Sequence, residues 1–400
     1  MRLILATNHL GLGGSESYLL TVAEQLERLG HEATVYGADP GPGTAVAEER
    51  GIPLASLDQL PSEPDAALVQ DAAVSYDLLA RFPSLPQVFV AHSESFDVQA
   101  PPQFGEAVRA VVALNDRVAA RIRISAGEPE VVRLRQPIDT ERFTPRSPLP
   151  PRARKALLLS NAPNDDRVAM VEAACSAAGI ELVRIGGREG QTRDPREAMH
   201  EVEIVIGYGR SVLEAMACGR AAYVYDWNGG EGWMTAESYP RIESDGIAGR
   251  SGETIVDGDR LAADLRAYSP AMGPVNHDLV IGHHRANVHA QQLVELLRRF
   301  GAAPSSNAEA PLEEMARLVR LEWRARTEVH KLQHENVALD QALQHLKARE
   351  RRAQEIAKQE ATKVERLAAA YEATLSWRLT APLRALGGLL GRRRRGRSTP

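Results

Sequence analysis

The segment EIVIGYGRSVLEAMACGRAAYVYDWNGGEGWM, residues 203–234, decides the fold of this chain. The apolar run 204–206 predicts a strand, residues 211–218 predict a helix, and the apolar run 221–225 predicts a second strand. Gly219 is expected to end the helix. A strand, a helix and a second strand in this order are typical of a parallel α/β sheet.

The turn Gly207-Tyr208-Gly209 marks a candidate binding site, because ligands of parallel sheets bind beyond the carboxyl ends of the strands. Unpaired N–H groups at the helix N-terminus can hold a phosphate, and Arg210 adds a fixed positive charge. Glu214 follows one helical turn later and is expected to face the same opening. The alternative is an ordinary crossover in which Glu214 is a solvated helix residue. The glycine-rich residues 229–232 are expected to form a loop.

The run SVLEAMACGRAAYVYD, residues 211–226, resembles the nucleotide-sugar-binding segment of family 4 glycosyltransferases, which have the GT-B fold. The resemblance implies that Glu214 binds the ribose of the donor. It also implies that the start of the helix borders the donor diphosphate, through Gly209, Arg210, Ser211 and Val212. The family usually carries a second Glu eight residues before the first, and this sequence has Ile206 there, inside the predicted strand.

Residues 1–150 are interpreted as the first α/β domain. A strand at 3–6 leads into a glycine-rich turn and a helix for which Ser15 is a plausible N-cap. Gly13 and Gly14 match the glycine pair that opens the inter-domain cleft in the family, although a plain tight turn explains them equally well. Further strands are expected at 32–36, 66–70, 87–91, 110–114 and 131–134, with helices at 73–80 and 115–124.

His92 follows the predicted strand 87–91, where a side chain faces the ligand crevice of a parallel sheet. The resemblance implies a position near the donor sugar and the acceptor, which makes His92 the candidate catalytic residue. A capping or loop histidine is the alternative. At the end of the domain, Asp139, Phe143 and Pro145 match the family's Asp-x-x-x-Phe-x-Pro turn, and residues 146–151 are expected to form a linker.

Residues 151–303 are interpreted as the second α/β domain. The family often places an Arg and, five residues on, a Lys after the first strand of this domain, where they neutralise the donor diphosphate. That pair is absent here, and Arg167 or Arg210 is a candidate substitute. Gly186 and Gly187 resemble the family's second glycine turn, near the nucleobase. Strands are expected at 156–159 and 181–185, with helices at 166–178, 195–200, 260–268 and 278–300.

Neither a metal nor a cofactor is expected. Asp257-Gly258-Asp259 has the carboxylate spacing of a divalent-metal motif, but we interpret it as a turn that caps the following helix. GT-B enzymes generally need no bound metal, which agrees. The predicted helix 278–300 is crowded with histidines whose spacing does not suit a metal site, so we interpret them as a polar helix face. These are His277, His283, His284 and His289. An apolar line is expected to pack this helix on its domain, through Val288, Leu293, Leu296 and Leu297.

Composition is that of a globular chain, with 44% apolar and 25% charged residues among 400. Two cysteines, Cys175 and Cys218, exclude a disulfide framework and favour a reducing compartment. No signal segment and no apolar run of about 18–20 residues are found, so a cytoplasmic protein is expected. The net charge of −5 conceals seven arginines and no acid in residues 376–400, against 41 basic and 53 acidic residues elsewhere.

The C-terminal quarter of the chain predicts an extended helix. Residues 312–374 contain no Gly or Pro and fit a heptad repeat over nine heptads, with Asn336 at an a position. This pattern favours a parallel coiled-coil homodimer, with a single solvated helix as the alternative. The box Ser-Trp-Arg-x-Thr-x-Pro-Leu-Arg in residues 376–384 resembles C-terminal tails of bacterial surface-polysaccharide glycosyltransferases. Its Trp and Leu, with the arginines up to 397, favour an anionic membrane surface over nucleic acid.

The sequence as a whole predicts a GT-B glycosyltransferase with two Rossmann-like domains facing a cleft. The domains are 1–150 on the acceptor side, 151–303 for the nucleotide sugar, 304–375 for the linker and coiled coil, and 376–400 for a basic amphipathic tail. The expected reaction is hexosyl transfer, with retention, from a nucleoside-diphosphate sugar to a glycan or lipid-linked acceptor in surface-polysaccharide synthesis. The expected location is peripheral, on the inner face of the plasma membrane. A catalytically silent scaffold and a nucleotide-sugar epimerase are the alternatives.

Overall fold

A computed structural model describes most of the chain. The described residues are 1–92, 100–102, 107–125, 130–160, 165–186, 190, 192–226, 229–252, 256–301, 310–373, 375–380 and 382. Two compact units are present, residues 1–321 and residues 322–400. The first unit contains both predicted α/β domains.

The first domain is built on a six-stranded sheet in the order β2-β1-β3-β4-β5-β6, and every neighbouring pair of strands is parallel. Each strand falls where the sequence predicts one. The first continues to Leu10 because His9 and Leu10 still pair with Asp39 and Pro40. The strands are β1 (Arg2–Leu10), β2 (Glu32–Pro40), β3 (Ala66–Val69), β4 (Gln87–Ala91), β5 (Val108–Ala113) and β6 (Glu130–Arg133).

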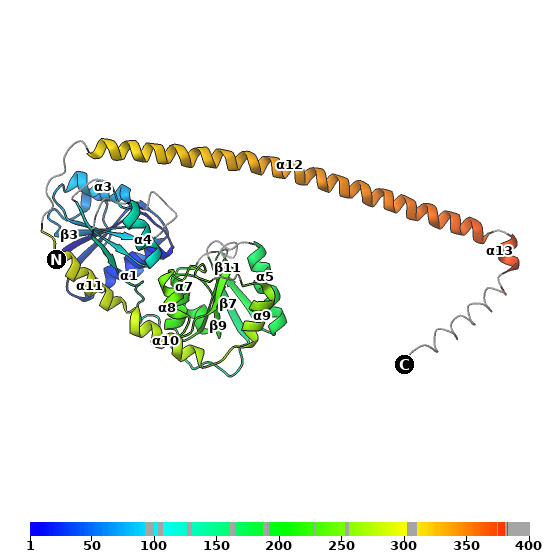
Figure 1. Ribbon diagram of the computed structural model, residues 1–400, viewed down its shortest axis with the longest axis horizontal. Coiled ribbons are helices and arrows are strands. Elements are labelled where there is room, and N and C mark those ends of the chain that lie inside the picture. The colour runs from blue at the N-terminus through cyan, green and yellow to red at the C-terminus, as the bar shows by residue number, and fades with distance from the viewer. Residues whose placement is uncertain are drawn as a thin grey trace. The chain divides into compact units, whose positions relative to one another are not determined.

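Helices cover both faces of this sheet (Figure 1). On one face α1 (Gly14–Arg28) shares a core with α11 (Ala286–Arg298), which comes from the far end of the α/β region. On the other face lie α3 (Ala72–Arg81) and α4 (Asp116–Ser125). The short helices α2 (Gly43–Glu49) and η1 (Leu57–Gln59) were not predicted.

Two details of these helices correct the predictions. The N-cap of α1 is Gly13, whereas Ser15 lies inside the helix and its hydroxyl donates to Glu16 Oε2 at 3.0 Å. On α11 the three leucines of the predicted apolar line are buried in the first domain's core, but Val288 is 36% exposed. Val288 therefore lies on the outer side of the helix, away from the packed leucines.

The second domain has a five-stranded sheet in the order β11-β10-β9-β7-β8. Its members are β7 (Lys155–Leu159), β8 (Glu181–Ile185), β9 (Ile204–Gly207), β10 (Ala221–Asp226) and β11 (Gly229–Trp233). The predicted loop at 229–232 is wrong, because these residues pair antiparallel with β10. Gly230 lies so close to Tyr225 that an added Cβ would stand 2.5 Å from its ring. The glycine permits this strand pairing rather than marking a loop.

Helices also pack around the second sheet (Figure 1). The predicted cap of α9 is confirmed, since the Asp257 side chain accepts from the Arg260 N–H at 2.8 Å. The helices are α5 (Asp165–Ala178), α6 (Arg196–His200), α7 (Arg210–Ala217), α8 (Tyr239–Ser244), α9 (Gly258–Arg266) and α10 (Met272–His283). Of these, α8 was not predicted.

The predicted helix 278–300 is two helices, α10 and α11, which are separated at His284 and Arg285. Arg285 is extended, with φ −63° and ψ 124°. The linker strand takes the backbone groups at the break: Ile138 N–H donates to the His284 carbonyl at 2.7 Å, and Ala286 N–H donates to the Ile138 carbonyl at 3.0 Å. A segment remote in sequence thus interrupts a locally helical pattern.

The predicted turn between the domains is formed. Asp139 Oδ1 accepts the N–H groups of Glu141 and Arg142 at 3.0 and 3.1 Å, as an Asx turn does. Phe143 is buried in the core of the second domain. Pro145 packs against Gly219, at which an added Cβ would lie 3.2 Å from the Pro145 ring. The motif therefore anchors the linker on the second domain.

Beyond the α/β region, α12 (Ala310–Glu372) is helical, as the heptad pattern predicts, and the short helix α13 (Leu375–Leu379) follows it. Within the described ranges, no helix has both the length and the apolar character that crossing a membrane requires. Most of the predicted small-residue linker (302–309) and most of the basic tail (383–400) lie outside the described residues.

Candidate functional site

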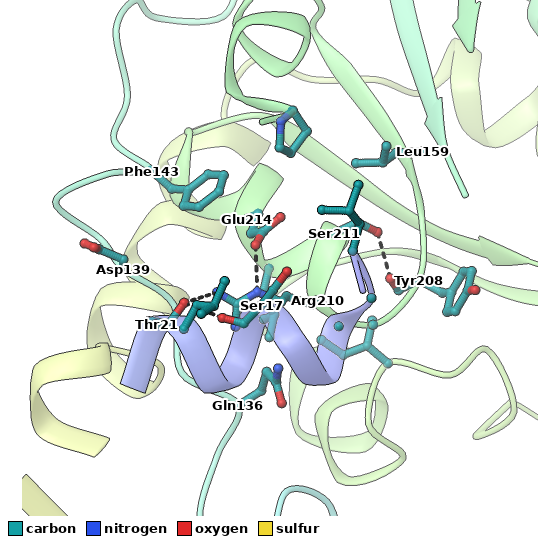
Figure 2. A pocket seen from close by; sticks show the side chains of 18 of the residues that line it. Ser17, Thr21, Gln136, Asp139, Phe143, Leu159, Tyr208, Arg210, Ser211 and Glu214 are labelled. Atoms are coloured by element: carbon teal, nitrogen blue, oxygen red, sulfur yellow. Dashed lines mark hydrogen bonds and ion pairs between the residues drawn. The ribbon is translucent and has the colours of Figure 1, made fainter. Parts of the chain in front are cut away.

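A cavity of about 340 Å³ opens where the carboxyl ends of the two sheets face each other. Its wall on the first domain comes from the loop between β1 and α1, from α1 itself and from His92 after β4. Its wall on the second domain is the turn before α7 and the first helical turns of α7 (Figure 2). This volume suits a small-molecule ligand, and the position is the one at which parallel α/β folds bind ligands.

The turn before α7 leaves a helix N-terminus open toward this cavity. Gly209 is the N-cap, with φ 58° and ψ −133°, and its own N–H donates to the Ile247 carbonyl at 2.9 Å. The Ser211 hydroxyl donates to the Tyr208 carbonyl at 2.7 Å, and no side chain of the described residues caps the helix. The N–H groups of the first turn have no acceptors within the helix. They are suited to hold an anion.

Arg210 does not project freely into this cavity. Its Nε donates to Glu214 Oε1 at 2.7 Å, one terminal nitrogen donates to the Pro137 carbonyl at 2.8 Å, and the other donates to Thr21 Oγ1 at 2.9 Å (Figure 2). Its side chain is 8% exposed. One guanidinium therefore joins α7 to α1 and to the linker, and its charge is balanced by Glu214.

Glu214 is a buried cleft residue rather than a solvated helix residue. Its side chain is 11% exposed and lines the cavity. Burial raises its pKa, and the Arg210 guanidinium opposes that rise. An oriented carboxylate one turn below an open helix N-terminus can accept hydrogen bonds from ligand hydroxyl groups.

His92 lies on the opposite wall, with its ring edge-on to Tyr18 at 4.9 Å between centroids. Burial and the nearby Arg210 lower the pKa of His92 to about 3, so the imidazole is neutral at physiological pH. Its Nε2 is buried and has no hydrogen-bond partner in the described part of the chain. The hydroxyl of Tyr18 is held by His289 Nε2 at 2.8 Å.

The prediction that the histidines of the C-terminal helix form a polar face is wrong for His284 and His289, which are 2% and 3% exposed. Both lie at the junction of the domains. His284 Nδ1 lies 2.7 Å from the Gln136 carbonyl, which only accepts, so Nδ1 carries the proton. Its Nε2 then accepts from the Tyr239 hydroxyl at 2.8 Å. Sequence reasoning missed this because the partners are remote in sequence.

The remaining predicted site residues divide into three groups. Gly13, Gly14, Gly209 and Ser211 line the cavity. Val212 is fully buried in the core and Gly186 turns after β8 with φ 101°; neither is among the described lining residues. Gly187 lies outside the described residues, as do residues 161–164, where the family's Arg would fall. Arg167 donates to the Tyr225 hydroxyl at 3.3 Å.

Several lining residues were not predicted as site residues, above all Thr21, Gln136, Arg50 and Arg142. Arg142 lies within the recognised linker motif, so its spacing carried a signal. Arg50 ends a helix that the sequence did not predict, and nothing local to it indicates a site. No group of three or more His, Cys, Asp or Glu side chains within the described ranges is arranged to hold a metal ion.

Two Rossmann-like domains that face a cleft, with a helix N-terminus of the second domain open into it, define the GT-B fold. No known family model matches the chain, and no curated protein matches its sequence. Solved structures do match. The Anabaena protein HepE in complex with UDP-glucose superposes with a TM-score of 0.56 and 14% identity, over 75% of this chain and all of that one.

Two further structures support the same fold. A glycosyltransferase from Rickettsia africae has a TM-score of 0.50 and 13% identity, over 74% of this chain and 98% of that one. An alpha-glucosyltransferase in complex with UDP and a 13-mer DNA has a TM-score of 0.50 and 10% identity, over 74% and 99%. At these identities the likeness establishes the GT-B fold, and the predicted architecture of the α/β region is confirmed.

The first prediction concerns the Arg210 contacts. Arg210→Gln is expected to lower the free energy of unfolding by about 3 kcal/mol, because it leaves the Glu214 carboxylate buried without a cation. Urea denaturation at pH 7 measures this. The double variant with Glu214→Gln should lose clearly less than the sum of the two single losses, since an amide in place of the carboxylate needs no cation. Additive losses would show that the two side chains are not coupled.

The second prediction concerns pH. The pKa of His284 in the folded chain is lowered to about 4 by burial, below the ordinary 6.5. As pH falls below 6.5 the unfolded chain takes up the proton first, so stability present above pH 6.5 is lost toward pH 4. His284→Gln should reduce this slope by up to about 1.4 kcal/mol per pH unit. Tyr239→Phe keeps the imidazole and should retain most of the slope; an unchanged slope in His284→Gln would contradict the assignment.

Proposed function

We propose that this chain is a glycosyltransferase that uses a nucleoside-diphosphate sugar as donor. One observation carries the proposal: the buried carboxylate of Glu214 lies one helical turn below an open helix N-terminus, and both face the cleft of a GT-B fold. Such a pair matches the two polar parts of a nucleotide sugar, its diphosphate and its ribose. The solved structures of HepE with UDP and UDP-glucose are neighbours of this fold and agree with the proposal.

In this proposal the first-turn N–H groups of α7 bind the diphosphate, and the helix dipole stabilises the charge that develops as the diphosphate leaves. Glu214 accepts hydrogen bonds from the ribose hydroxyls. Arg210 holds Glu214 in place and keeps α7 docked on α1, so it acts as a positioning residue. Gly13, the N-cap of α1, and Gly14, its first residue, border the ligand from the first domain.

His92 is proposed to contact the transferred sugar or the acceptor hydroxyl. Because its pKa is lowered to about 3, it acts as a neutral hydrogen-bonding group rather than as a cation. Its Nε2 is buried and has no hydrogen-bond partner among the described residues, so this atom is available for that contact. Retention of configuration is proposed on the resemblance alone, and no residue is assigned as a nucleophile.

The proposed acceptor is a glycan or a lipid-linked glycan of the cell surface. Support comes from the sequence of the tail, 376–397, in which arginines alternate with Trp and Leu as in segments that bind anionic membranes. A soluble catalytic unit that binds the membrane by such a tail would work peripherally on the inner face. The first domain would bind the acceptor and the second the donor.

A catalytically silent scaffold is the second candidate, and two observations favour it. Ile206 occupies the position of the family's second Glu and is fully buried in β9, so it offers no contact to a sugar. The guanidinium of Arg210 is already bound by three protein acceptors, so it does not replace the absent Arg–Lys pair. Donor turnover separates the two candidates.

We further propose that α12 forms a parallel homodimer. Among the side chains of α12 that the structure describes, nine large apolar ones are exposed. Eight of them occupy a or d positions of the predicted heptad, and Ile356 adjoins them. These eight are Val329, Leu332, Leu339, Leu343, Leu346, Val364, Leu367 and Tyr371. A seam of this kind is buried by a second copy of the same helix. Asn336 at an a position would fix the register.

The third prediction tests the donor site. UDP and a panel of nucleoside-diphosphate sugars are titrated against the full chain, with binding followed by calorimetry and turnover by release of free nucleoside diphosphate. Glu214→Gln should weaken donor binding at least about tenfold, because it removes a charged acceptor. Glu197→Gln, an exposed carboxylate on α6, should bind like the original chain. A donor that binds but is never turned over would favour the scaffold. If no nucleotide or nucleotide sugar binds, both the donor site and the proposed glycosyltransferase activity are contradicted.

The fourth prediction tests the dimer by sedimentation equilibrium of the full chain. The original chain should sediment at twice the 43.6 kDa of one copy. The double change Val364→Asp and Leu367→Asp places charges at two positions of the seam. It should therefore raise the dissociation constant of the dimer at least about a hundredfold. Gln359→Asp with Thr362→Asp adds the same charge outside the seam and should leave the dimer intact. A monomeric original chain would contradict the proposal.

A further inference from the structure

A second hollow, of about 430 Å³, adjoins the cleft, and none of its described lining residues belongs to the α7 turn. It shares Arg50, Arg142 and Arg193 with the cleft wall. We call this hollow the arginine basin. Its arginines are Arg28, Arg50, Arg142, Arg193 and Arg196.

The outer arginines of the basin are matched by carboxylates. Arg28 lies 3.0 Å from Glu141 and 3.6 Å from Asp139. Arg193 lies 3.2 Å from Glu49. Arg196 donates from Nε to both carboxylate oxygens of Asp194, at 2.8 and 2.9 Å. These arginines leave no positive charge in excess.

The inner pair is different, because Arg50 and Arg142 share one carboxylate. Arg142 reaches Glu24 Oε1 at 2.9 Å and Arg50 reaches Glu24 Oε2 at 3.4 Å. Two guanidinium groups thus share one carboxylate at Glu24, although the basin as a whole has as many carboxylates as arginines, because Arg28 faces two. Burial and the nearby Arg142 lower the pKa of Arg50, so its charged form is disfavoured where it stands. An anion at this place would relieve that cost.

Arg50 also offers a donor that the protein does not use. Its side chain is 14% exposed, and its Nε is buried with no hydrogen-bond partner among the residues the structure describes. Buried donors are normally paired, so a donor of this kind at a cavity wall indicates a ligand atom. The guanidinium fork matches the geometry of phosphate oxygens.

We propose that Arg50 and Arg142 form a phosphate-binding subsite, separate from the α7 turn, for a ligand that binds alongside the nucleotide. The arginine basin is lined by none of the α7 turn residues in the described part of the chain, although Arg50 and Arg142 also line the cleft, so the test must separate the two places. Arg50 and Glu24 belong to the first domain and Arg142 to the linker. If the proposed function holds, the second ligand is a phosphorylated acceptor; the phosphate site itself does not rest on that function.

The fifth prediction tests this subsite by calorimetry with inorganic phosphate as the probe, at low ionic strength because salt screens the interaction. The full chain, with and without saturating UDP, is expected to bind one phosphate in both conditions. Arg142→Gln should weaken phosphate binding at least about tenfold and leave UDP binding unchanged. Arg50→Lys keeps the charge but loses Nε, and should weaken it less. Arg2→Gln, a surface arginine paired with Glu63, should bind phosphate as the original chain does.

The outcomes separate the possible sources of the phosphate. UDP could abolish phosphate binding, and Arg142→Gln could at the same time bind UDP more weakly. These two results together would assign both arginines to the nucleotide's own diphosphate and overturn the second-ligand assignment. Equal phosphate binding by Arg142→Gln and the original chain, or none by either, would overturn the subsite. If UDP alone fails to bind, the donor proposal fails, while the arm without UDP still tests the basin.

Discussion

The two α/β domains are joined around one buried guanidinium. Arg210 begins α7, and its nitrogens reach Glu214 on the same helix, Thr21 on α1 and the Pro137 carbonyl of the linker. A charged group this deeply buried is tolerated only when its donors are satisfied. Moving α7 away from α1 would leave part of the guanidinium without acceptors, so these hydrogen bonds oppose a widening of the cleft.

This arrangement decides how the charge in the cleft is distributed. Arg210 is neutralised by Glu214, so the open N–H groups of α7 carry the positive character next to the turn. Further along, Arg50 and Arg142 share the single carboxylate of Glu24. An arginine one helical turn before a glutamate in the sequence does not reveal this. The sequence is the same whether the arginine is paired within the protein or available to a ligand. Only the partners of each guanidinium distinguish a bound charge from an available one.

Local patterns predicted most of the fold, and contacts between remote segments explain where prediction failed. The unit β9-α7-β10 follows from apolar runs and a glycine stop that lie next to one another. The break between α10 and α11 depends on Ile138, and the β-strand at Gly229–Trp233 depends on the close approach of Gly230 to Tyr225. For the site, Glu214 could be predicted from its motif, whereas Arg50 could not, because its role comes from sharing Glu24 with an arginine of the linker.

The burial of Glu214 helps to distinguish a site that binds a ligand from a scaffold that has no use for one. A buried ion pair contributes little net stability, and apolar residues of similar size often serve a fold equally well. A scaffold would need neither the carboxylate nor its guanidinium partner at a cavity wall, whereas a ligand with hydroxyl groups would use the carboxylate directly. Ile206 removes one polar contact of the family's pattern but leaves this one in place. Under the proposed function, the cleft therefore keeps the polar contacts expected for a nucleotide more fully than those expected for its sugar.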